Sequence, residues 1–363
     1  MKIACIVGTR PEAIKMAPVI LALREQPWAQ VAVIATAQHR ELADDVFGLF
    51  GIVPDVDLDL MQPGQGLSDL AARAITALDR VLADTAPDLV LAQGDTTSVM
   101  AAALACFYRQ VPFAHVEAGL RSFDLQNPYP EEFNRIVASR IATLHFAPTD
   151  EARANLRREG VPQARIVVTG NTVIDALHWV AAREPKSPLA AGPNRLLLVT
   201  VHRRENFGAP LRDICRAVLA LLDEYPDVKV LWPVHPNPNV SSPIRAALGA
   251  AERVHLVEPL RYGPFVGALR EAYLVLTDSG GVQEEAPALG RPVLVLRRAT
   301  ERPEAIAAGV ARAVGTNFDD IVRHARELLD DRASYQAMAR AVSPYGDGQA
   351  SGRIVQAIRE AFP

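Results

Sequence analysis

Short apolar segments alternate with helix-length amphipathic segments along almost the whole of this 363-residue chain. The apolar segments of the first half are 3–7, 31–35, 89–92, 113–116, 144–146 and 166–168. A second series lies at 196–201, 228–233, 254–257, 274–277, 292–296 and 311–314. Strands that are apolar on both faces and separated by helices are typical of parallel sheets covered on both sides. The sequence therefore predicts an α/β protein with two doubly wound, Rossmann-like domains.

The boundary between the two domains is expected near a linker rich in proline and alanine, residues 184–194. The helical segment 172–182 fits either domain, and we expect an N-terminal domain over 1–170 and a C-terminal domain over 171–349. A final amphipathic helix at 350–363 is expected to pack back on the first domain. Because ligands bind beyond the carboxyl ends of strands in open α/β sheets, we expect the domains to face a central cleft.

The composition excludes several classes of protein. A net charge of −4 argues against a nucleic-acid-binding surface, so a few local cations must hold any bound phosphate. Cys5, Cys106 and Cys215 stand far apart in apolar segments, which is typical of buried side chains rather than of disulfides or metal sites. The first apolar run ends at Val7, which is too short for a signal peptide or a membrane span. We expect a cytoplasmic protein that does not bind membranes.

A turn of small residues follows the expected strand at 272–277 and precedes an expected helix at 283–289. The amides of Ser279, Gly280 and Gly281 then lie bare at a helix N-terminus, where the helix dipole favours a phosphate. A carboxylate such as Glu285 suits the hydroxyls of a ribose. The turn therefore favours a nucleoside diphosphate, although such glycines can also serve only to tighten a strand-to-helix turn.

The first strand ends in a turn at 8–15 that opens a helix, with Pro11 at a position suited to its first turn. Arg10 and Lys15 lie near this helix N-terminus, where the dipole disfavours cations unless an anion is bound. The two cations therefore favour a diphosphate contact, and solvated surface charges are the alternative.

Two carboxylates follow consecutive strands of the first half. Asp95 either serves the chemistry or caps the helix that begins near Thr97, which is the commoner use of aspartate there. Glu117 either points into the cleft or pairs with Arg121. The sequence favours a functional role for Glu117.

Glu131 and Arg135 lie one turn apart on the same face of an expected helix, after the proline-rich segment 127–130. The two side chains either form an i,i+4 ion pair on the surface or are directed inward, toward Glu117.

Polar residues of the second half also follow expected strands. His202 and His235 come after the segments 196–201 and 228–233, and Arg302 follows 292–296. Neither histidine has the spacing of metal ligands, and no cysteine lies nearby, so we expect no metal. An imidazole opposite a diphosphate is better suited to stabilise or protonate a leaving group.

Taken together, the motifs of this chain resemble those of the non-hydrolysing UDP-N-acetylglucosamine 2-epimerases over essentially its whole length. The matching motifs are GTRPE at 8–12, QHR at 38–40, QGDT at 93–96, HVEAGLR at 115–121, PEEFNR at 130–135, HRREN at 202–206, DSGGVQEE at 278–285 and TERPE at 300–304. The resemblance implies GT-B architecture, a homodimer, and interconversion of UDP-GlcNAc and UDP-ManNAc in the supply of cell-surface polysaccharides.

The chemistry of the substrate agrees with this implication. The C2 proton of an N-acetylhexosamine is not next to a carbonyl, so we expect elimination of UDP to a bound 2-acetamidoglucal and re-addition, without nicotinamide, metal or other cofactor. By resemblance, the catalytic residues are Asp95, Glu117, Glu131, Arg135 and His202. The residues that would bind UDP and the sugar are Arg10, Lys15, His235, Ser279, Gly280, Gly281, Glu285 and Arg302.

The resemblance also implies a second UDP-GlcNAc that acts as an allosteric effector beside the active site. Its expected contacts are Gln38, His39, Arg203 and Glu205. Alternatively, Gln38 and His39 only cap a helix that begins near Glu41. Rival functions are an epimerase of a related UDP-2-acetamido sugar such as a uronic acid, a GT-B glycosyltransferase, and a catalytically silent UDP-sugar-binding regulator.

Overall fold

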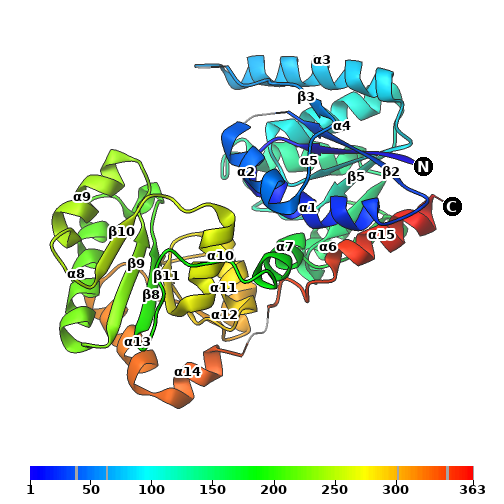
Figure 1. Cartoon of the computed structure of the whole chain (residues 1–363). Coiled ribbons are helices and arrows are strands. Elements are labelled where there is room, and N and C mark those ends of the chain that lie inside the picture. The colour runs from blue at the N-terminus through cyan, green and yellow to red at the C-terminus, as the bar shows by residue number, and fades with distance from the viewer. Residues whose placement is uncertain (37–39, 63, 301, 341–342, 363) are drawn as a thin grey trace. The chain divides into compact units, whose positions relative to one another are not determined.

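The computed structural model of the protein describes residues 1–36, 40–62, 64–300, 302–340 and 343–362. The chain forms two compact α/β units (Figure 1). Unit 1 contains Met1–His178 and Tyr345–Pro363, and unit 2 contains Trp179–Pro344. The chain therefore leaves unit 1 inside α7 (Thr172–Ala181), later than the position 170/171 expected from the sequence. Each unit has its own parallel sheet with alternating helices, so the predicted pair of doubly wound sheets is confirmed.

Unit 1 has a seven-stranded sheet in the order β3-β2-β1-β4-β5-β6-β7. The strands are β1 (Lys2–Val7), β2 (Gln30–Ala35), β3 (Val56–Asp57), β4 (Leu89–Gln93), β5 (Phe113–Val116), β6 (Leu144–Ala147) and β7 (Ile166–Val168). The helices are α1 (Arg10–Arg24), α2 (Arg40–Phe50), α3 (Leu67–Thr85), α4 (Thr97–Arg109), α5 (Glu131–Ile141), α6 (Asp150–Arg158), α7 and α15 (Ala350–Ala361). The sequence did not predict β3, because two residues are too few to show a strand pattern.

The core of unit 1 lies between the central strands and the helices on either side. Leu78 of α3 and Val99 of α4 are buried against the sheet together with Val90 of β4. The C-terminal helix α15 lies beside α1, and its Ile354 and Ile358 are buried (Figure 1). Unit 1 is therefore completed by the last segment of the chain.

The parallel strands of unit 1 send the loops after β1, β4, β5 and β7 to the same edge of the sheet. At this edge the turn after β1 packs tightly against the start of α4. A Cβ at Gly8 would lie 2.5 Å from the Ser98 Oγ and 2.6 Å from the Thr36 Oγ1, so only glycine fits. Helix α1 then starts with Thr9 as its N-cap, in a capping box with Glu12.

Unit 2 has a six-stranded sheet in the order β10-β9-β8-β11-β12-β13. Its strands are β8 (Arg195–Thr200), β9 (Val228–Pro233), β10 (Val254–Val257), β11 (Ala272–Thr277), β12 (Val293–Val295) and β13 (Ala311–Ala313). Its helices are α8 (Ala209–Glu224), α9 (Pro238–Leu248), α10 (Tyr262–Glu271), α11 (Gly280–Ala288), α12 (Pro303–Ala307), α13 (Phe318–Asp330) and α14 (Arg332–Met338). The fully buried Trp232 lies in a core of aliphatic side chains from the sheet, α8 and α13.

The described part of the chain contains no helix that is both long enough and apolar enough to cross a bilayer. Over the same residues, no group of three or more histidine, cysteine or acidic side chains is arranged to hold a metal ion. Cys5, Cys106 and Cys215 are free thiols, each buried as the sequence predicts.

Candidate active site

Glu117 lies at the carboxyl edge of the unit 1 sheet, where several side chains donate hydrogen bonds to its carboxylate. It follows β5 with a φ of +61°, a left-handed conformation that is uncommon for a residue with a side chain. Its buried carboxylate accepts hydrogen bonds from the Lys15 Nζ at 2.7 Å to both oxygens and from the Asn171 Nδ2 at 2.9 Å. The Gln93 Nε2 donates to the Glu117 Oε2. These donors favour the ionised carboxylate.

The alternative pairing of Glu117 with Arg121 is wrong. Arg121 is fully buried and donates to both carboxylate oxygens of Glu159, at 2.6 and 2.8 Å. Lys15 pairs with Glu117 instead, across 102 positions of sequence. A phosphate contact by Lys15 stays a prediction.

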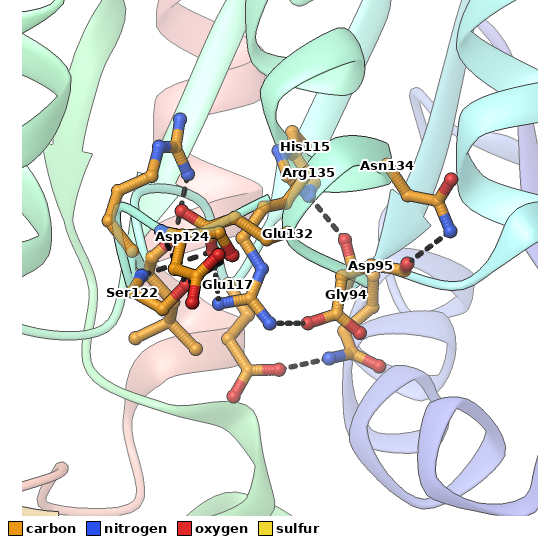
Figure 2. Close-up of polar contacts among 12 residues, drawn as sticks. Gly94, Asp95, His115, Glu117, Ser122, Asp124, Glu132, Asn134 and Arg135 are labelled. Carbon is orange, nitrogen blue, oxygen red and sulfur yellow. Dashed lines mark hydrogen bonds and ion pairs between the residues drawn. The ribbon is translucent and has the colours of Figure 1, made fainter. Parts of the chain in front are cut away.

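Asp95 lies next to Glu117, in the loop between β4 and α4. The interpretation of Asp95 as a helix cap is wrong, because the Thr96 hydroxyl is the N-cap of α4. An Arg135 Nη2 donates to the Asp95 Oδ2, and the Asn134 Nδ2 donates to the Asp95 carbonyl at 2.9 Å (Figure 2).

Burial and the neighbouring charges together shift the pKa of Asp95. Burial raises the pKa of Asp95, and the nearby carboxylates of Glu117 and Glu131 raise it further. The cationic groups of Arg135 and Lys15 lower it, but burial is the largest effect and the net direction is upward. Asp95 therefore takes up a proton more readily than an ordinary aspartate.

The i,i+4 ion pair between Glu131 and Arg135, one of the two alternatives, is not formed. Arg135 instead contacts Glu132 at 3.3 Å, one position further along α5, as well as Asp95. Glu132 is fully buried, and its carboxylate also accepts the backbone N–H groups of Ser122 and Phe123 at 3.1 and 3.0 Å. Arg135 is thus held between two carboxylates, and Glu131 stays half-buried in the first turn of α5.

His115 contacts the loop that carries Asp95 through a hydrogen bond to Gly94. Its ring Nε2 lies 2.7 Å from the Gly94 carbonyl, and the residue is completely buried in β5. Burial lowers the pKa of His115 to about 4, so the ring is neutral at pH 7 and its Nε2–H donates to Gly94. No role was predicted from the sequence for the supporting residues Gln93, His115, Glu132, Asn134 and Asn171, although the first four lie within the motifs at 93–96, 115–121 and 130–135. Asn171 follows β7 at the same edge, and this position was the one signal that could have found it.

In unit 2, the buried Asp278 organises the residues that follow β8. Its carboxylate accepts the backbone N–H groups of His202 and Arg203 at 3.0 and 2.9 Å, and the Asn206 Nδ2 at 2.9 Å. The His202 Nδ1 lies 3.2 Å from the Asp278 Oδ1. Burial alone would raise the pKa of Asp278, but the hydrogen bonds from His202 and Arg203 outweigh it and lower the pKa. Asp278 is therefore ionised and orients the His202 ring.

His202 stacks on His235, with 6.0 Å between ring centroids and 23° between the planes. The two rings come from the carboxyl ends of the neighbouring strands β8 and β9. Burial and the neighbouring His202 both lower the pKa of His235. Each histidine follows a strand as predicted, and the stacking of the two rings was not predicted from the sequence.

The glycine turn of unit 2 begins α11 earlier than predicted, at Gly280 rather than at 283. The Ser279 amide is not bare, because it donates to the Thr277 Oγ1 at 2.9 Å. The Gly280 and Gly281 amides make no hydrogen bond within the part of the chain that the structure describes. The expected phosphate turn therefore has two available amides rather than three.

Two guanidinium groups flank this turn. A Cβ at Gly280 would lie 3.9 Å from an Arg203 Nη2 and 4.0 Å from an Arg302 Nη2. Arg302 also donates to the buried Glu284, and the Arg203 Nε donates to the Asp278 carbonyl at 3.0 Å. Guanidinium groups beside a helix N-terminus make a local site for an anion.

Glu285 and Glu205, which were predicted to contact ligands, accept hydrogen bonds from side chains of unit 2. Glu285 is buried and accepts from the Tyr262 hydroxyl at 2.8 Å, and Glu205 accepts from the Arg297 Nε at 2.8 Å. Gln38 and His39, predicted as effector ligands, lie outside the described residues. Arg10 opens α1 at the carboxyl end of β1, as predicted.

A carboxylate cluster in one α/β unit and an anion-binding turn in the other fit the class of enzymes that act on nucleotide sugars. The family model described as UDP-N-acetylglucosamine 2-epimerase matches residues 21–359. UDP-N-acetylglucosamine 2-epimerase from Salmonella typhimurium is 51% identical over 370 residues, which cover 99% of this chain and 98% of that protein. The protein of the same name from Escherichia coli strain K12 is 50% identical, with 99% and 98% covered.

A solved structure of UDP-GlcNAc 2-epimerase from Neisseria meningitidis, bound to UDP-GlcNAc, superposes with a TM-score of 0.91. It is 44% identical, and the match covers 99% of this chain and 100% of that one. The chain belongs to the UDP-N-acetylglucosamine 2-epimerase family, which confirms the resemblance seen in its motifs.

Proposed function

We propose that this chain is an isomerase that interconverts UDP-GlcNAc and UDP-ManNAc. The observation that carries the proposal is the group of acidic side chains at one edge of unit 1. Glu117 is held by three side-chain donors, whereas burial raises the pKa of the neighbouring Asp95. Acid–base catalysis requires environments that push the pKa values of two carboxyl groups apart in this way. The relatives named for this activity match the chain from end to end.

The reaction that suits these groups is elimination followed by addition. A carboxylate takes the C2 proton, the C–H electron pair forms the C1=C2 double bond, and UDP leaves C1 with the electrons of the C–O bond. The bound 2-acetamidoglucal then accepts UDP back at C1 while a carboxylic acid protonates C2 on the opposite face. The anchored Glu117 suits the base, and Asp95 suits the acid.

Glu131 lies close enough to affect the charge of Asp95, and it can exchange protons with the same sugar carbon. Arg135 orients Asp95 through the ion pair between them. Arg135 thereby keeps the carboxyl group of Asp95 pointed in one direction through both halves of the reaction.

The leaving UDP needs positive groups around its phosphates. In the proposed mode Gly280 and Gly281 donate backbone amides, and Arg302, Arg10 and Lys15 add positive charge, with Ser279 lining the same turn. The His202 imidazole, with the ionised Asp278 behind it, stabilises the departing diphosphate, and His235 stacks on it. Glu285 binds the ribose hydroxyls. No step requires a nicotinamide or a metal ion.

Self-association and effector binding complete the proposal. Phe107 and Tyr108, at the end of α4, are exposed by 63% and 66%, and this aromatic surface supports a homodimer. A second UDP-GlcNAc is proposed as an activator that contacts Gln38, His39, Arg203 and Glu205. A cytoplasmic location remains a prediction from the sequence.

The direct test is incubation of the purified protein with UDP-GlcNAc alone, followed by chromatographic separation of the two sugar nucleotides. The proposal expects part of the UDP-GlcNAc to be converted to UDP-ManNAc until a constant mixture of the two is reached. A product formed only after addition of a sugar acceptor would indicate a glycosyltransferase instead.

A further inference from the structure

We propose that Asn171 is a positioning residue for this reaction, because its side-chain amide fixes the direction in which the Glu117 carboxylate faces. The inference rests on the proposed function, in which Glu117 moves the C2 proton. Asn171 acts through Glu117 and is not proposed to touch the sugar.

Two hydrogen bonds fix the orientation of the Asn171 side chain, and a third holds its backbone. Its Nδ2 donates to the Glu117 Oε1 at 2.9 Å, and its Oδ1 accepts the Val173 N–H at 3.1 Å. Its own backbone N–H donates to the Tyr345 carbonyl at 2.6 Å. Because the Val173 N–H occupies the oxygen, the amide can present only its NH2 group to Glu117.

Lys15 and Gln93, which also donate to Glu117, are held less firmly than Asn171. The side chain of Lys15 is 16% exposed, and an ammonium on a four-carbon stem can follow the carboxylate as it turns. The Gln93 Nε2 also donates, but the buried Gln93 Oε1 has no partner among the described residues. Asn171 is therefore the donor that specifies a direction, while Lys15 supplies charge.

The surroundings of Asn171 explain its rigidity. Tyr345 is the residue at which the chain re-enters unit 1, and the returning segment lies directly on the turn after β7. A Cβ at Gly170, where φ is +87°, would lie 3.2 Å from the Gly346 Cα. The left-handed φ of Gly170 and this close approach both favour glycine, and the approach holds Asn171 between β7 and the returning segment.

The test is Asn171→Asp, which changes little in shape. The new carboxylate still accepts the Val173 N–H, but it places an oxygen against the Glu117 Oε1 where a donor stood. Like charge and the lost donor both make Glu117 easier to protonate, so the acid limb of the kcat–pH profile moves to higher pH. We expect a shift of about one to two pH units, and a fall in kcat of about tenfold or more at pH 7. Calorimetric UDP affinity should be unchanged.

A second variant separates the contact between Asn171 and the Val173 N–H from the hydrogen bond that Asn171 donates to Glu117. In Asn171→Ser the hydroxyl can still accept the Val173 N–H, but it is too short to reach Glu117. Its acid limb should also move upward, by less than in Asn171→Asp. This variant decides the matter if thermal melting shows that Asn171→Asp does not fold.

Asp175→Asn is the matched control. Asp175 also lies on α7 and binds the returning segment, through the Ala350 and Ser351 amides at 3.2 and 2.7 Å, but it has no contact with Glu117. It should leave the acid limb in place. An unmoved limb in an active Asn171 variant, or an equal shift in Asp175→Asn, would overturn the inference. No conversion of UDP-GlcNAc by the unaltered protein would instead contradict the proposed function itself.

Discussion

Glu117→Gln is the substitution for which the structure gives the most definite expectation. Glutamine keeps the shape of the side chain and can still accept from the Asn171 Nδ2, but it loses the charge that pairs with Lys15. Its NH2 group then takes the place of the Glu117 Oε2 and faces two donors, Lys15 and Gln93. Breaking a buried ion pair costs about 3–5 kcal/mol. Because Lys15 keeps some contact with water, we expect a loss of about 2–3 kcal/mol in the free energy of unfolding.

The effect on catalysis should be separate from this loss of stability. Removal of a positioned acid–base group lowers turnover by about 10²- to 10⁴-fold. The affinity for UDP should stay nearly intact, because Glu117 serves the sugar. Steady-state rates with UDP-GlcNAc and calorimetric titration with UDP separate the two quantities, with Arg10→Ala as the contrasting variant that weakens UDP binding. A loss of UDP affinity in Glu117→Gln as large as its loss of turnover would refute the assignment.

Three further predictions follow from other parts of the molecule. Gly280→Ala directs a methyl group toward Arg203 and Arg302, so calorimetry should show UDP binding weakened about tenfold or more in a normally folded protein. Burial lowers the pKa of His115 to about 4, so the folded protein loses stability as the pH falls from about 6.5 to about 4. Urea unfolding should show that the free energy of unfolding falls by about 2 kcal/mol more in the unaltered protein than in His115→Gln between pH 7 and pH 5. UDP-ManNAc alone should react slowly until a trace of UDP-GlcNAc is added, and Gln38→Ala should abolish this activation; hyperbolic kinetics in both directions would contradict it.

The sequence predicts the sheets and the edge at which the site lies, because these depend on short-range patterns. Asp95 and Glu117 follow strands that are consecutive in the sequence, and consecutive strands usually lie side by side in a sheet, so their proximity could be expected. The same rule would have pointed to Asn171, which follows β7.

Side-chain partners could not be derived in the same way. Arg135 is within reach of both Glu131 and Glu132, and the choice depends on the backbone amides that bury Glu132. Lys15 reaches Glu117 only because β1 and β5 lie on either side of β4. Such pairings depend on the order of the strands and on side-chain direction, neither of which is encoded in local spacing.

The proposed elimination breaks the C2–H bond and re-forms it with a proton derived from solvent, so an incubation in heavy water reports on this step. The protein is incubated with UDP-GlcNAc in heavy water, without added metal or nicotinamide, and the sugars are examined by proton NMR and mass spectrometry. If UDP is eliminated and re-added as proposed, we expect UDP-ManNAc that carries solvent deuterium at C2, together with traces of free UDP and 2-acetamidoglucal. UDP-ManNAc that retains the original hydrogen at C2 would contradict the account.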